Sequence, residues 1–154
     1  MLETKIEQLM SEGKLQKEDS ALERAEGLVR EAVVDLDEAQ KTQEMGAYRA
    51  TFFLAYMAML RSGRAFLILN GYRPANCSRH KTIVEVTTIL MGQDHRDISD
   101  HFYMALEKQL DLIHNGGAML NEIEAHDAFH YALLLTREIV KKIKEQDSDF
   151  HVSM

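Results

Sequence analysis

A run of cationic side chains without acidic neighbours is the feature of this sequence best suited to chemistry. Between Met45 and Val84 the chain carries six Lys and Arg residues and no Asp or Glu. The whole chain carries −7 and this window +6, so the remaining residues carry −13. Because a cationic strip within an acidic body attracts anions, the window predicts a site for a phosphate or a carboxylate-rich partner. The alternative is that its arginines pair with carboxylates on neighbouring helices.

The predicted ligand-binding residues of this strip fall into two groups. Arg61 and Arg64 lie three residues apart on one side of a predicted helix, where two guanidinium groups can hold a phosphate bidentately. The same side chains can instead meet Glu31 or Asp35 of the preceding helix. The second group occupies the connection that follows and consists of Tyr72, Arg73, Arg79, His80 and Lys81. Connections face solvent, and the tyrosine ring adds a stacking surface for a base, so this group favours RNA or a nucleotide.

A second kind of chemistry is open to two histidines near the end of the chain. His126 and His130 lie four residues apart, one helical turn, and bind a metal jointly if a third ligand comes from elsewhere. Their place at the edge of the apolar stripe equally fits solvated side chains. The chain has no Gly-rich phosphate loop, paired-cysteine motif, serine elbow or DNA-reading zinc pattern. The sequence therefore predicts no cofactor and no DNA-specific role.

Composition predicts one all-α domain over residues 1–154. The chain is 45% apolar, contains one Pro and no Trp, and is rich in Ala, Leu, Met, Glu, Lys and Arg, a balance typical of helical proteins. The lone Cys77 excludes an internal disulfide, and the N-terminal residues do not resemble a secretory signal, so we expect a cytoplasmic protein. The longest apolar run, 50–60, is shorter than the ~20 residues of a membrane-spanning helix. No membrane segment is expected.

Helical periodicity supplies the elements that position these residues. It predicts helices over about 20–36, 47–70, 83–91, 98–113 and 121–143, after a short helix and linker in 1–16 and before a frayed tail in 147–154. The core of the bundle is expected over about 18–145. Ser20 with Glu23, and Asn121 with Glu124, have the spacing of capping boxes. Gly63 lies in the middle of an almost wholly apolar helix, which predicts close crossing by another helix.

Three segments carry a resemblance to a known family. They are the long helix from Ala47 through Gly63 to Pro74, the polar connection with His80, and the closing helix with the sequence Glu-Ala-His-Asp-Ala from Glu124. Over roughly residues 21–144 the chain resembles the HEPN family, helical-bundle domains of prokaryotic toxin and defence proteins. The resemblance implies an up-and-down bundle of four or five helices, commonly a homodimer, often acting beside a nucleotidyltransferase partner as in toxin–antitoxin pairs.

Many HEPN proteins are metal-independent ribonucleases with an Arg-x4-6-His motif after the penultimate long helix. The corresponding segment here, residues 112–120, contains His114 followed by Asn115 but no Arg and no second His. The catalytic motif is therefore degenerate. Arg73 and His80 have a permitted spacing, although they lie in the earlier connection. The resemblance thus favours a non-catalytic module that binds RNA, a nucleotide or a partner protein, with an atypical ribonuclease or a metal-dependent bundle enzyme as the alternatives.

Overall fold

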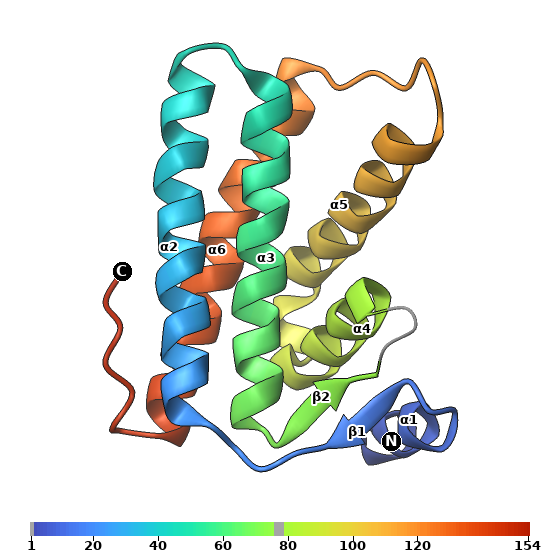
Figure 1. Cartoon of the computed structure of the whole chain (residues 1–154), viewed down its shortest axis with the longest axis vertical. Helices are drawn as coiled ribbons and strands as arrows, with labels where there is room; N and C mark the ends of the chain where they lie inside the picture. The colour runs from blue at the N-terminus through green and yellow to red at the C-terminus, as the bar shows by residue number, and fades with distance from the viewer. Residues whose placement is uncertain (1, 76–78) are drawn as a thin grey trace.

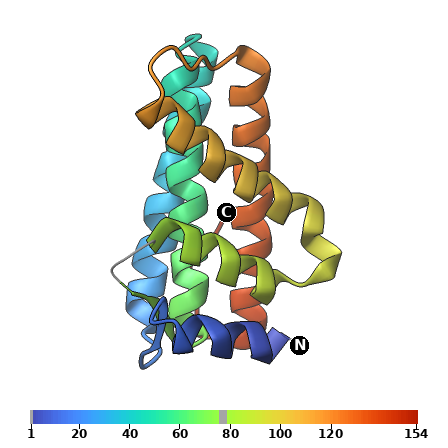
Figure 2. The same cartoon turned by 90° about the vertical axis from the view of Figure 1, so that its right-hand side faces the viewer.

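The chain folds as an all-α bundle, as the sequence predicts. The computed structural model describes residues 2–75 and 79–154, so Cys77 lies outside the described residues. The elements are α1 (Leu2–Ser11), β1 (Leu15–Lys17), α2 (Leu22–Glu44), α3 (Tyr48–Leu69), β2 (Tyr72–Pro74), α4 (Arg79–Met91), the 3-10 turn η1 (Gln93–His95), α5 (Arg96–His114) and α6 (Glu122–Gln146). Helices α2 and α3 run antiparallel beside α6, and α4 and α5 cross them obliquely (Figures 1 and 2).

Helix α3 is the central element of the bundle because other helices cover most of its circumference. It packs against α2, α4, α5 and α6. The apolar run considered in the sequence, residues 50–60, is shorter than a membrane span. By length and composition, the whole helix α3 is long and apolar enough to cross a membrane. However, 67% of its most apolar 18-residue window is buried inside the bundle. Its apolar character is therefore that of a core helix.

The close crossing predicted at Gly63 is present. A Cβ atom built on this residue would lie 2.8 Å from the Oγ1 atom of Thr87 and 3.0 Å from the Cγ2 atom of Ile83, both on α4. Phe102 of α5 lies 3.5 Å from the same position. The missing side chain therefore allows α4 to pack directly on the backbone of α3, and this contact fixes where the connection between them lies.

A two-stranded sheet replaces the irregular connection that the sequence predicts after α3. Strand β1 pairs antiparallel with β2 in the register Leu15 to Pro74, Gln16 to Arg73 and Lys17 to Tyr72. Gly71 makes the turn out of α3 with a φ of 83°. Leu15 is 2% exposed, so the pairing also buries an apolar side chain. The N-terminal arm, residues 2–19, is thereby tied to the segment that carries the predicted ligand-binding residues.

The two predicted capping boxes have different outcomes. At α6 the box is formed: the Oδ1 atom of Asn121 accepts from the backbone N–H of Glu124 at 2.8 Å, and the Glu124 carboxylate accepts in return at 3.2 Å. At α2 the prediction is wrong, because the helix begins at Leu22 after Ala21, which makes no side-chain cap. Strand β1, which precedes α2, is held by its pairing with β2, so this long-range contact sets where α2 begins.

The C-terminal tail is packed, not frayed as expected. Phe150 and Val152 are 3% and 7% exposed. The backbone N–H of His151 donates to the Glu26 carboxylate at 2.8 Å, which holds the tail along α2. Apolar burial therefore extends the core beyond the predicted limit near residue 145.

Candidate anion-binding cavity

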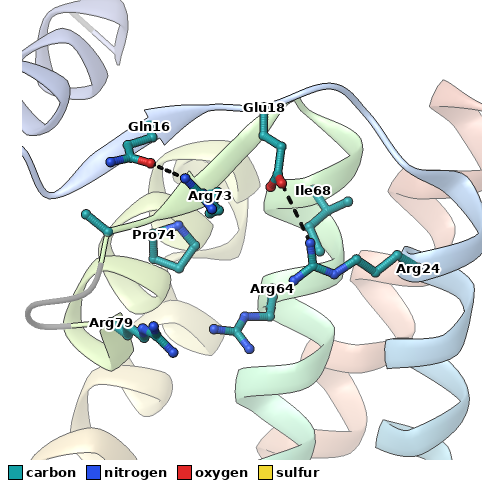
Figure 3. A pocket seen from close by; sticks show the side chains of 9 residues that line it. Gln16, Glu18, Arg24, Arg64, Ile68, Arg73, Pro74 and Arg79 are labelled. Carbon is teal, nitrogen blue, oxygen red and sulfur yellow. Dashed lines mark hydrogen bonds and ion pairs between the residues drawn. The ribbon is translucent and has the colours of Figure 1, made fainter.

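Three arginines of the strip, together with an arginine of α2, converge on one cavity, which we call the arginine cavity. It has a volume of about 250 Å³ and lies between the N-terminal arm and helices α2, α3 and α4 (Figure 3). Its lining consists of Gln16, Glu18, Arg24, Arg64, Ile68, Arg73, Pro74, Ala75 and Arg79. Four guanidinium groups thus face one carboxylate among the described residues that line the cavity.

Each of the four arginines comes from a different element. Arg24 belongs to the first turn of α2, Arg64 to the second half of α3, Arg73 to the middle of β2 and Arg79 to the start of α4. In Figure 3 the guanidinium group of Arg64 extends toward Arg79, while Arg24 reaches in from the opposite side toward Glu18. The α2–α3 hairpin, the strand pairing and the Gly63 crossing must all form to bring these groups together.

Arg64 is affected by both burial and neighbouring positive charge. It is half-buried, and burial lowers the pKa of its guanidinium group, as do the charges of Arg24 and Arg79. Like charges held close together in a partly desolvated site repel one another unless an anion lies between them. The arrangement therefore favours an anion in the arginine cavity.

The partners of Arg24 and Arg73 within the lining supply a single negative charge between them. Arg24 lies 3.8 Å from the Glu18 carboxylate, a loose ion pair with both side chains accessible to solvent. Arg73 donates a hydrogen bond to the side-chain oxygen of Gln16, its neighbour across the sheet, and that partner is neutral. An incoming anion would meet guanidinium groups already oriented by the arm.

Arg61 is paired with acidic side chains of α2 and does not line the arginine cavity. Its Nη1 atom lies 2.7 Å from both carboxylate oxygens of Asp35, and its Nε atom lies 3.4 Å from Glu31. Arg61 and Arg64 therefore do not act as a pair. The alternative that the sequence left open, pairing with the acids of the preceding helix, is confirmed for Arg61.

The remaining residues of the predicted strip lie outside the arginine cavity. Tyr72 lines a second hollow, which shares Glu18 with the arginine cavity and is also lined by Lys17, Asp19, Asn70 and Gly71. Lys81 is exposed and lies 3.9 Å from Glu85, one turn further along α4. The cationic strip is thus divided, and only its Arg64, Arg73 and Arg79 members share one cavity.

His80 is held by a buried tyrosine. The hydroxyl of Tyr56, a residue 2% exposed, lies 3.1 Å from the Nδ1 atom of His80. Burial raises the pKa of Tyr56, so its hydroxyl stays protonated and can both donate and accept. Burial and the nearby Arg64 lower the pKa of His80, which favours the neutral ring. We expect the tyrosine to donate to Nδ1, with the ring proton on Nε2.

Replacing Tyr56 with phenylalanine is expected to raise the pKa of His80, because it removes the donor that stabilises the neutral ring. Titration of the imidazole C–H resonances by NMR measures this shift, with the other histidines as the internal reference. An unchanged pKa in Tyr56→Phe would contradict the assigned tautomer.

The other candidate residues for catalysis or metal binding, His114, His126 and His130, do not line the arginine cavity. His114 is exposed at the end of α5, whereas β2 and the start of α4, which contribute to the arginine cavity, lie toward the opposite end of the bundle (Figure 1). His126 and His130 are exposed on α6, and His126 lies 3.7 Å from Glu122. Within residues 2–75 and 79–154, no group of three or more His, Cys, Asp or Glu side chains is arranged to hold a metal ion.

Three polar lining residues escaped the sequence analysis: Gln16, Glu18 and Arg24. Arg24 stands between Glu23 and Glu26, so the local charge gives no hint of a cationic site. The sequence does hold one signal for Arg24: the short turn between α2 and α3 makes these helices antiparallel neighbours. Arg24 lies about three helical turns before Asp35, and α3 ends about two turns beyond Arg61. The Asp35–Arg61 contact therefore places Arg24 close to the end of α3. The two arm residues are placed only by strand pairing, which the sequence does not indicate.

No protein-family model matches the chain, and no curated protein sequence matches it significantly. The case for a function therefore depends on the arginine cavity and on its chemistry.

Proposed function

We propose that this protein is a non-catalytic, HEPN-like binding module that takes a phosphate group of RNA or of a nucleotide into the arginine cavity. The observation that carries the proposal is the convergence of four guanidinium groups from four elements on one cavity whose described lining has a single carboxylate. This narrows the predicted strip to Arg64, Arg73 and Arg79 and adds Arg24.

Phosphate fits this lining better than a partner protein's carboxylate does. A guanidinium group binds phosphate oxygens bidentately, and a phosphate has several oxygens that accept from different directions. Arginines approach here from α2, α3, β2 and α4, so several donors can reach one tetrahedral group. A carboxylate is planar, with a single charge, and would satisfy fewer of them. Helix α4 also begins beside the cavity with Arg79, and the N-terminus of a helix favours negative charge.

A binding role is favoured over ribonuclease activity by the position of His80. A ribonuclease of this type needs the arginine that stabilises the phosphate and the histidine that transfers the proton at the same ligand. His80 contacts Tyr56 and does not line the arginine cavity with Arg73. Incubation with mixed RNA in the absence of metal tests this point. Cleavage that His80→Ala abolishes would overturn the binding-only proposal.

The expected homodimer or nucleotidyltransferase partner has a candidate surface away from the arginine cavity. Large apolar side chains are exposed on the outer half of α5, the following loop and the start of α6: Met104, Leu110, Ile113, Met119 and Ile123. Exposed apolar side chains gathered on neighbouring elements are typical of protein–protein contact sites. Contact there would leave the arginine cavity open to its ligand.

Replacing Arg64 with glutamine is expected to weaken binding of adenosine monophosphate and of a short RNA by about tenfold or more. This corresponds to losing one charge-assisted contact of about 1.5–3 kcal/mol. Because Arg24 and Arg79 repel Arg64, the variant should keep or raise its melting temperature. Isothermal titration calorimetry measures the dissociation constants.

Arg49→Gln is the matched control for this experiment. Arg49 is an exposed arginine on the same helix, α3, but it stands in the first turn and does not line the arginine cavity. Its replacement changes the net charge equally and should leave affinity nearly unchanged. Equal losses in both variants would mean that only the overall charge attracts the ligand, which would refute a site at the cavity.

A further inference from the structure

We infer that the arginine cavity selects a terminal phosphate monoester, on a free nucleotide or at an RNA end, over the internal phosphodiesters of a nucleic acid chain. This inference rests on the proposed function, since it specifies which phosphate the same cavity takes.

Charge balance between lining and ligand favours the monoester. Four guanidinium groups and one carboxylate give the described lining three positive charges in excess. The carboxylate, Glu18, is placed against Arg24 at the side of the cavity, and the partner of Arg73 is the neutral Gln16. A phosphodiester carries one negative charge, whereas a monoester carries roughly −1.5 to −2 at pH 7. The dianion neutralises more of the excess.

The size and walls of the cavity favour the same ligand. A volume of about 250 Å³ is below the roughly 300–1,000 Å³ of pockets that enclose a whole drug-sized ligand. Beyond the arginines the wall is formed by Ile68, which is 4% exposed, and by the buried Pro74. An internal phosphodiester must have polynucleotide leaving on both sides. A terminal phosphate enters with a single ester substituent directed to solvent, so it fits a recess of this size.

The directions of the donors also match a terminal phosphate. Arg64 and Arg79 point toward one another in Figure 3, while Arg24 and Arg73 approach from other elements. Donors that surround a group can contact all three non-ester oxygens of a monoester. A diester offers two such oxygens, and its second ester oxygen is a poor acceptor. The arrangement therefore discriminates by the number of free phosphate oxygens as well as by charge.

Two matched pairs of ligands test the inference with the full chain. The first pair is adenosine 5′-monophosphate and its 5′-methyl ester, which differ in one charge and one free oxygen. The second is a short RNA with a 5′-phosphate and the same RNA with a 5′-hydroxyl. We expect the monoester of each pair to bind at least about tenfold more tightly in calorimetric titrations, and Arg64→Gln to remove most of that difference. The two pairs also separate the possible sources, a free nucleotide and an RNA end.

The outcomes distinguish this inference from the proposed function. Equal affinity for the 5′-phosphate and 5′-hydroxyl RNAs, with both lost in Arg64→Gln, would overturn monoester selection and leave phosphate binding at the cavity intact. Absence of binding by all four ligands would overturn both. A preference for the monoester that persists in Arg64→Gln would also overturn the inference, because the discriminating group would then lie elsewhere.

Discussion

Replacing Gly63 with leucine is expected to destabilise the protein by about 3 kcal/mol or more, the largest effect predicted for any single position. The new side chain would begin at a Cβ only 2.8 Å from Thr87 and 3.0 Å from Ile83, so α4 must move away from α3. Overpacking of a well-filled core typically costs about 1–3 kcal/mol, and a displaced helix adds to this. Urea unfolding followed by circular dichroism measures the loss.

Gly27→Ala is the matched control, because Gly27 lies inside α2 with no atom within 4 Å of the position that a Cβ would occupy. Removing a helical glycine without a clash should stabilise the protein by up to about 1 kcal/mol. Gly63→Ala gains the same helix propensity, but its new Cβ would clash with Thr87, so we expect a net loss of stability. Stabilisation by Gly63→Ala comparable to that by Gly27→Ala would mean that α3 and α4 do not pack as closely as described.

The main helices follow from local pattern, because apolar periodicity and the need to bury it act within single segments. Helix α3 illustrates this: its predicted limits, about 47–70, agree with Tyr48–Leu69, and its apolar circumference predicted enclosure by other helices. The mid-helix glycine even predicted a close crossing. Propensity and packing agree along this segment, so the sequence alone is informative.

The small sheet was not predictable in the same way. Each strand is three residues long, too short for an alternating pattern, and the whole of α2 and α3 separates the two strands in the sequence. The failed capping box at Ser20 has the same origin, since the strand pairing of the arm decides how the chain enters α2. Such long-range contacts leave no local signature.

The candidate site was predicted in part. A charge count located Arg64, Arg73 and Arg79 but also included Arg61, because charge along the sequence does not reveal which side of a helix faces an acid. It missed Arg24, whose neighbours along the chain are acidic. The sequence gives the number and positions of the basic side chains. The antiparallel packing of α2 on α3 decides which of them pair with acids and which converge on the cavity.

The second large effect concerns the pair formed by Asp35 and Arg61. Asp35 is 5% exposed, and Arg61 donates to both of its carboxylate oxygens at 2.7 Å. Arg61→Met is expected to destabilise the protein by about 3 kcal/mol at pH 7, since it leaves a buried carboxylate without its partner. The value lies at the lower end of the usual range because the arginine side chain is 31% exposed and its loss is partly compensated by water.

The double variant Asp35→Leu with Arg61→Met should recover most of this loss. Replacing a buried ion pair by apolar groups of similar size is often neutral or stabilising, whereas removing one partner is not. The surface pair of Lys41 and Asp37 provides the control: its atoms are 2.9 Å apart, and the two side chains are 69% and 62% exposed. Lys41→Met is therefore expected to change the free energy of unfolding by less than about 0.5 kcal/mol. A double variant no more stable than Arg61→Met would contradict the proposed coupling.

The effect of Arg61→Met should also depend on pH, in a direction set by Asp35. Burial raises the pKa of this carboxyl above its ordinary value, and Arg61 opposes the shift. The folded protein therefore binds the proton more tightly than the unfolded chain, so stability falls as pH rises from the ordinary value through the raised pKa. Without Arg61 the pKa rises further, and the fall extends to higher pH. The difference in stability between the native protein and Arg61→Met should thus shrink as pH is lowered toward about 4, near the ordinary pKa of an aspartate, as measured by urea unfolding across that range.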